Sequence, residues 1–217
     1  MSTKLNYLIT DADGVIFDRM PAILEAFAKA MLPLGINEKQ VISYVLGSLG
    51  APFESQVKGM VEQAGKTISD DDIRQTRCRF WETFDDNDIK LFPGIKDTLD
   101  NLKASGIGIL VSTGSRTAEI EQLFAEFDLP HDLILGSDEI LKGDEHINVF
   151  AGHFSMQKTD FCRQAAFIGD GTVDMEIAAR NGIYGIGITN SIAAAPLLAA
   201  GAKAIVADFG EIIKLLR

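Results

Sequence analysis

The feature of this 217-residue sequence that most constrains its fold is a series of short apolar segments, each ending abruptly at polar residues or glycine. Uninterrupted apolar runs of about four to eight residues are typical of strands buried on both faces of a parallel sheet. The runs lie at residues 5–10, 107–111, 133–136, 165–168, 184–188 and 204–206. Amphipathic segments with a helical period alternate with the later runs, at residues 95–104, 117–127, 174–181 and 193–200. This alternation predicts an α/β fold, a three-layer Rossmann-like core whose central parallel sheet has helices on both faces.

Residues 18–91 interrupt this alternation. The stretch has no apolar run like those of the expected strands. It contains four amphipathic segments separated by glycine-containing turns, at residues 20–34, 38–49, 53–64 and 70–84. The sequence therefore predicts an all-helical domain at 18–91, inserted into an α/β core domain formed by residues 1–17 and 92–217.

Composition argues against several classes of protein. A formal net charge of −11 without a visible basic patch argues against nucleic-acid binding. No segment approaches the roughly 18 apolar residues of a membrane span, and the N-terminus has no signal-peptide pattern. Cys78 and Cys162 lie far apart and suit a reducing cytoplasm. With His131, His146 and His153 scattered, they supply no zinc-ligand cluster. We therefore expect a cytoplasmic protein with neither a nucleic-acid nor a membrane partner.

Acidic residues stand at the ends of two expected strands, which is where ligands bind in open parallel sheets. Asp11 and Asp13 follow the first strand in the sequence DADGV, and Asp170 and Asp174 follow the fourth in GDGTVD. Either motif alone is compatible with an acidic turn or with a favourable charge at a helix N-terminus. Four acids at two strand ends instead form an oxygen-rich site for a hard cation such as Mg²⁺, and neighbouring carboxylates repel unless a cation lies among them.

The order of these motifs resembles that of the haloacid dehalogenase-like hydrolase superfamily. The family pattern is an apolar strand ending in DxDG[TV], a strand ending in Thr or Ser, a lysine, and an apolar strand ending in GDxxxD. The corresponding segments here are residues 8–15, 110–114, a lysine, and residues 167–174. The resemblance spans essentially the whole chain. The helical insertion resembles the cap of the phosphoglycolate phosphatase and β-phosphoglucomutase branch, and residues 92–95 (FPGI) resemble its return from cap to core.

The resemblance implies a phosphatase with a covalent mechanism. Asp11 would attack phosphorus and form an aspartyl-phosphate, while Asp13 would protonate the leaving alcohol and then activate the water. Mg²⁺ would be bound by Asp11, the backbone carbonyl of Asp13 and Asp170, with Asp174 as a direct or a more distant ligand. A carboxylate is a weak nucleophile toward a phosphate dianion, so a bound cation is physically reasonable.

The residue that binds the phosphate at the second strand end is either Thr113 or Ser112. Thr113 fits the resemblance better, because the family residue is usually followed by Asn, Gly or Ala, and Gly114 follows here. The backbone of Gly114 would assist at a helix N-terminus.

The phosphate-binding lysine is either Lys142 or Lys158. Lys142 is favoured, because it leaves room for a helix at 144–154 before the fourth strand, as a crossover connection requires. Lys158 lies twelve positions before Asp170 and leaves little such room. The family branch usually has Lys-Pro where this sequence has Lys142-Gly143.

These motifs favour a phosphatase that acts on a small phosphorylated metabolite. A phosphomutase that returns the phosphoryl group to a sugar is the alternative, and a non-catalytic binding module is disfavoured because no motif acid is missing. The sequence identifies neither the substrate nor the oligomeric state. Cationic residues of the cap could contact the substrate, although such residues on amphipathic helices normally face water: Arg19, Lys58, Arg74, Arg77 and Arg79.

Overall fold

The computed structural model describes residues 5–85 and 89–216, so residues 1–4, 86–88 and 217 of the expected domain ranges lie outside the described residues. Its centre is a six-stranded parallel sheet with the order β3-β2-β1-β4-β5-β6. The strands are β1 (Tyr7–Thr10), β2 (Gly108–Ser112), β3 (Leu133–Leu135), β4 (Ala165–Gly169), β5 (Tyr184–Ile188) and β6 (Ala204–Val206). The predicted Rossmann-like α/β fold is confirmed.

Helices cover both faces of the sheet because successive strand residues alternate between two hydrophobic clusters. Leu8 of β1 packs into one cluster with Phe124, whereas its neighbour Ile9 packs into the other with Phe150. The first cluster includes α5 (Ile95–Ala104), α6 (Thr117–Glu126) and α11 (Ile212–Leu215). The second includes α7 (Asp144–His153), α8 (Lys158–Arg163) and α9 (Thr172–Asn181). A small third cluster joins α9 to α10 (Ala194–Ala199).

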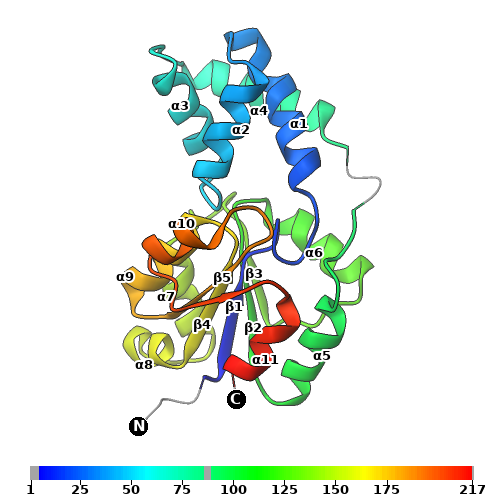
Figure 1. Ribbon diagram of the computed structural model, residues 1–217, viewed down its shortest axis with the longest axis vertical. Helices are drawn as coiled ribbons and strands as arrows, with labels where there is room; N and C mark the ends of the chain where they lie inside the picture. The colour runs from blue at the N-terminus through cyan, green and yellow to red at the C-terminus, as the bar shows by residue number, and fades with distance from the viewer. Residues whose placement is uncertain (1–4, 86–88, 217) are drawn as a thin grey trace.

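Four helices between β1 and α5 form a cap above the carboxyl ends of the strands (Figure 1). They are α1 (Met20–Met31), α2 (Glu38–Gly47), α3 (Phe53–Gln63) and α4 (Asp70–Thr83), and the 3₁₀ turn η1 (Leu32–Leu34) extends α1. Asn37 and Ser69 begin α2 and α4 with capping boxes, which satisfy backbone N–H groups of the first turn. The four helices have a hydrophobic cluster of their own.

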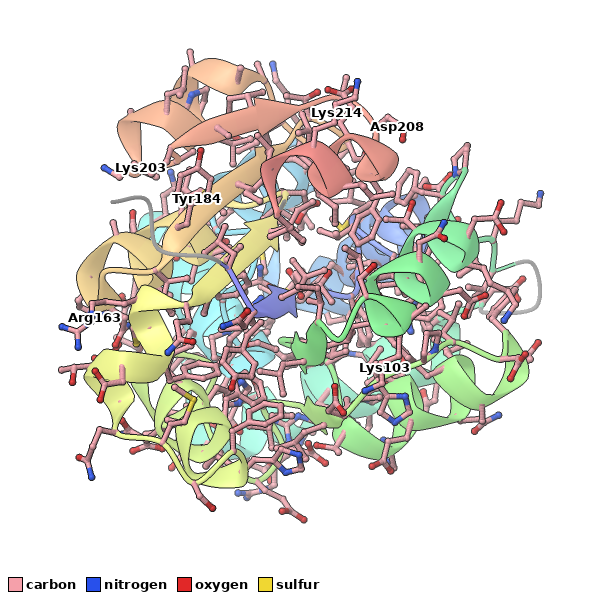
Figure 2. The ribbon with its side chains drawn as sticks, turned by 90° about the horizontal axis from the view of Figure 1, so that it is seen from below. Lys103, Arg163, Tyr184, Lys203, Asp208 and Lys214 are labelled. Carbon is pink, nitrogen blue, oxygen red and sulfur yellow. The ribbon has the colours of Figure 1, made fainter. Side chains whose placement is uncertain are left out.

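The structure contains short helices that the sequence pattern does not reveal. These are α8, the 3₁₀ turn η2 (Phe209–Glu211) and α11, each too short to show a helical period. Viewed from the end opposite the cap, β1 lies at the centre of the molecule, and Arg163 and Lys203 lie at the edge of the view (Figure 2). Among the described residues, no helix has both the length and the hydropathy to cross a bilayer.

Candidate active site

The carboxyl ends of β1 and β4 bring the two acidic motifs together. The strand order reverses between these two neighbours, which is where open α/β sheets bind ligands. Asp11 directly follows β1, and its backbone N–H donates to the carbonyl of Ile168 in β4 at 3.0 Å. Ligand oxygens of Asp11, Asp170 and Asp174 lie within 4.8 Å of one another, and all three residues are buried. Three of the four acids singled out in the sequence therefore form one cluster.

Lys142 reaches this cluster from the loop between β3 and α7. Its Nζ lies 3.0 Å from Oδ2 of Asp11 and 2.7 Å from Oδ1 of Asp174, and its side chain is fully buried. Burial opposes the ammonium charge, but the attraction of Asp11 and Asp174 outweighs it and raises the pKa of Lys142 well above its ordinary value. Lys158 instead begins α8, which leads into the amino end of β4 at the opposite edge of the sheet (Figure 1). The structure thus brings Lys142, and not Lys158, to the acids.

Burial is the main reason why the pKa values of all three carboxyls are raised. Burial, followed by repulsion from Asp174, raises the pKa of Asp170 to about 7. Lys142 opposes the shift at Asp11, while the other carboxylates add to it. With all four groups ionised, three carboxylates and one ammonium leave a net charge of −2. A divalent cation would neutralise this charge, and oxygen ligands are those that Mg²⁺ prefers, so the residues fit a magnesium site.

Asp13 lies beside this cluster, where two side chains hold its carboxylate. The hydroxyl of Ser115 donates to Oδ2 at 2.6 Å, and Nε of Arg19 lies 3.2 Å from Oδ1. Arg19 also forms an ion pair with Glu119 of α6 and lies over the ring of Phe84. Burial raises the pKa of Glu119, although Arg19 opposes the shift. The carboxylate of Asp13 is therefore fixed in orientation at the junction of core and cap.

The loop between β1 and α1 approaches β4 closely enough to require glycine. Gly14 has a φ of +78°, and a Cβ atom on it would lie 1.9 Å from Oδ2 of Asp170. Asn190 donates to the carbonyl of Gly14 at 2.8 Å, and the Ser191 hydroxyl donates to Asp170. Sequence reasoning assigned no role to Asn190 or Ser191, although their position just after β5 places them at the same edge of the sheet.

The contacts of His146 show which of Thr113 and Ser112 faces the cavity. The carbonyl of Ile140 can only accept, so His146 donates from Nε2 to it at 2.9 Å, and Nδ1 then accepts from the Ser112 hydroxyl at 2.9 Å. Burial lowers the pKa of His146 and favours this neutral form. Ser112 is thus engaged inside the core. Thr113 accepts from the N–H of Ser115 at 3.1 Å and lines the cavity beside Asp11, with its hydroxyl hydrogen available to a phosphate oxygen.

The loop between α2 and α3 reaches from the cap down to the core (Figure 1), where it approaches Asp174 of the acidic cluster. A Cβ atom on Gly171 would lie 2.4 Å from the carbonyl oxygen of Leu49, and one on Gly50 would lie 3.1 Å from Oδ1 of Asp174. Between the cap and the core is a cavity of about 850 Å³, lined by Asp11, Asp13 and Asp170 as well as by cap helices. These three acids therefore lie in a partly open cavity between cap and core.

The other cationic residues of the cap have different surroundings. Lys58 and Arg77 line the cavity, and Arg77 is paired with Glu54 at 2.7 Å. Arg74 pairs with a neighbouring acid on the exposed face of α4, as expected for an amphipathic helix. Arg79 donates to a backbone carbonyl of α1. Of the five, Arg19 alone lies within 4 Å of a sequence-predicted catalytic acid in the described structure.

Comparison with known proteins identifies the family and the fold. A family model described as haloacid dehalogenase-like hydrolase matches residues 8–188. A phosphoglycolate phosphatase of Haemophilus influenzae is 24% identical over 201 residues, which cover 87% of this chain and 88% of the relative.

Solved structures with the same fold include a candidate β-phosphoglucomutase from Bacteroides vulgatus. It has a TM-score of 0.84 and 20% identity and covers 99% of this chain and 90% of its own. A hydrolase from Pseudomonas syringae has a TM-score of 0.83 and 18% identity, with 97% of both chains covered. At these identities the two structures establish the shared fold.

Proposed function

The chain belongs to the haloacid dehalogenase-like hydrolase family and is a phosphatase, and from this premise we propose that it hydrolyses a phosphomonoester through an aspartyl-phosphate formed on Asp11. The substrate is a phosphorylated metabolite. The observation that carries the proposal is the buried cluster of Asp11, Asp170, Asp174 and Lys142 beneath the cavity. Both cysteines are free, in keeping with the cytoplasmic location that we also propose.

Asp11 is the proposed nucleophile because its carboxylate is held in place and opens on the cavity. The backbone N–H of Ala12 donates to Oδ1 at 2.8 Å, and Lys142 lies 3.0 Å from Oδ2. A carboxylate fixed in this way attacks phosphorus without first losing rotational freedom. The charge of Lys142 opposes the rise that burial causes in the pKa of Asp11. It also attracts the phosphate oxygens, which Thr113 and the backbone N–H of Gly114 also bind.

Asp13 is the proposed general acid and base. In the first step an oxygen of Asp11 forms a bond to phosphorus while the bond from phosphorus to the ester oxygen breaks, and the ester oxygen takes the proton of Asp13. In the second step Asp13 removes a proton from water, whose oxygen attacks phosphorus while the bond to Asp11 breaks. Ser115 and Arg19 hold the two oxygens of Asp13 for both transfers. Inorganic phosphate leaves, and both acids return to their initial states.

Asp11, Asp170 and the backbone carbonyl of Asp13 are the proposed Mg²⁺ ligands, with Asp174 adjacent and paired to Lys142. When bound, the cation neutralises negative charge on the carboxylate and on the phosphate.

Phosphate release from a broad panel of phosphomonoesters tests the proposal. We expect turnover with Mg²⁺, loss of turnover with EDTA, and a loss of at least ~10³-fold in kcat for Asp11→Asn. Comparable kcat in Asp11→Asn would refute the covalent mechanism. Turnover that requires a bisphosphate activator and releases no inorganic phosphate would instead identify a phosphomutase.

A further inference from the structure

The cavity wall contributed by the cap is mostly apolar and aromatic, and from it we propose that the substrate's leaving group is a bulky, largely apolar alcohol, with an aromatic one fitting best. This inference rests on the phosphatase function proposed above and specifies its substrate class. Polyols, sugars and two-carbon acids would be poor substrates by comparison.

The aromatic part of the wall is a continuous cluster. Phe27 and Phe53 are stacked with ring centroids 5.0 Å apart, and Phe80 lies within 5.2 Å of both. Trp81 packs perpendicular to Phe80 at 5.1 Å. All four line the cavity, and Phe53 and Trp81 are only half-buried. The guanidinium of Arg77 lies over the ring of Phe53 at 5.6 Å, so a ligand would meet the part of this ring that the guanidinium leaves exposed. Aromatic rings favour another ring in edge-to-face or offset contact.

The core faces this wall with a second apolar element. Leu141, one residue before Lys142, is 62% exposed and lines the cavity. An apolar side chain this exposed beside a catalytic lysine gains most when an apolar ligand covers it. Arg116, just before α6, lies 5.4 Å from the ring of Trp81, so core and cap meet at this edge of the cavity.

Several polar groups of the wall are already engaged. The buried Arg19 is paired with Asp13 and Glu119, and Arg77 is paired with Glu54 at the exposed edge of the wall. The side-chain amide of Gln56 donates to the carbonyl of Ser48, the residue directly after α2, at 3.0 Å. Substrate hydroxyls would displace these pairs or stay unsatisfied, and sites that lack matched partners select against such groups.

Among the other polar side chains that line the cavity, that of Ser137 is half-buried and donates to the carbonyl of Thr113 at 3.0 Å. Those at the exposed rim include Ser55, Lys58, Cys78, Asp138 and Glu139. The volume agrees with this division, because cavities of about 300–1,000 Å³ hold ligands far larger than a two-carbon group. At about 850 Å³ the chamber is near the upper end of that range.

Substrates with primary-alcohol leaving groups test the proposal, because the alcohols then differ little in acidity. We expect kcat/KM for 3-phenylpropyl phosphate to exceed that for ethyl phosphate, glycerol 3-phosphate and 2-phosphoglycolate by at least ~10-fold. Equal or higher kcat/KM for the polar substrates would overturn the inference while leaving the phosphatase function intact.

Binding without turnover gives an independent measurement. Trp81 is the single tryptophan of the chain, so its fluorescence reports on the wall. We expect 3-phenylpropylphosphonate, which has no ester bond to cleave, to bind at least ~10-fold more tightly than ethylphosphonate. Tight binding of the phenylpropylphosphonate without hydrolysis of any ester would refute the proposed phosphatase function but support the apolar specificity of the cavity. Equal affinities for the two phosphonates would refute that specificity.

Replacing residues of the cavity wall tests whether they cause the preference for an apolar leaving group. Trp81→Ser and Leu141→Ser should each lower the ratio of kcat/KM for 3-phenylpropyl phosphate over ethyl phosphate by several-fold. The ratio is independent of the fraction of folded enzyme, and the exposure of Leu141 makes its replacement safe for folding. Leu32→Ser is the matched control, because Leu32 is 66% exposed on the cap but does not line the cavity. A ratio unchanged in both wall variants would overturn the proposal.

Discussion

Replacing Gly171 with alanine tests whether the cap meets the core during turnover as the structure shows. Gly171 has a φ of −113°, so alanine introduces no backbone strain. Its Cβ atom would nevertheless lie 2.4 Å from the carbonyl oxygen of Leu49. Ordinary contacts between such atoms begin at about 3.5 Å, so the cap loop must withdraw by roughly 1 Å. A displacement of that size beside the reacting groups reduces turnover by about 10²-fold.

The measurement is kcat and kcat/KM for phosphate release, with thermal unfolding as a check on the fold. Gly114→Ala should lower kcat less, by below about 10-fold. Its Cβ atom would lie 3.3 Å from the carbonyl oxygen of Ala51, which needs to move by only a few tenths of an ångström. Gly47→Ala is the control, since a Cβ atom there meets nothing within 4 Å. Unchanged kcat in a fully folded Gly171→Ala enzyme would show that this contact is not part of the active state.

Four further outcomes are expected. Lys142→Met should lower kcat by at least ~10²-fold in phosphate-release assays, because it removes the only ammonium within 4 Å of the described acids of the cluster. Thr113→Val should lower kcat/KM by about 10-fold or more, the value of a hydrogen bond to a charged group, whereas Ser112→Ala should change it about 2-fold at most. Mg²⁺ at about 100 times its Kd should raise Tm by roughly 5–10 °C in thermal unfolding, and EDTA should reverse this; no shift would contradict a divalent-cation site. Burial alone would raise the pKa of Asp132, but hydrogen bonds from Lys103 and a backbone N–H outweigh it and lower the pKa. Its stabilisation is therefore complete above about pH 4 and lost below, so Asp132→Asn should lower the unfolding free energy in urea by about 1 kcal/mol at pH 7 and by little at pH 2.

The fold is largely predictable from the sequence because its strands are buried on both faces. The strands at 184–188 and 204–206 have the bounds expected from the sequence, and so has the helix at 95–104. Other boundaries shift by a few residues: the first strand begins at Tyr7, and the helix expected from Asp174 begins at Thr172. The short helices α8 and α11 were not expected from the sequence, whereas α10, which like α8 has six residues, lies within the segment expected at 193–200.

The chemistry of the site is predictable to a lesser degree. The rule that ligands bind at strand ends correctly selects Asp11 and Asp170, but their contact depends on β1 and β4 being neighbours, which no local pattern specifies. The roles of Ser191 and His146 depend on side chains that lie 21 and 34 positions from their partners in the sequence. Hydrogen bonds over such separations follow from the assembled sheet and leave no motif.

Arg19 shows why the usual reading of a cationic helix residue fails at the junction of two domains. Such a side chain normally faces water because burying its charge is costly. Arg19 precedes the first turn of α1, so the solvent-facing period of that helix does not govern it. Its side chain is 2% exposed, and burial is tolerable only because Asp13 and Glu119 both offset the charge. Removing either acid would take one of these carboxylates away from a buried cation, so the junction and the proposed acid/base residue depend on the same charges.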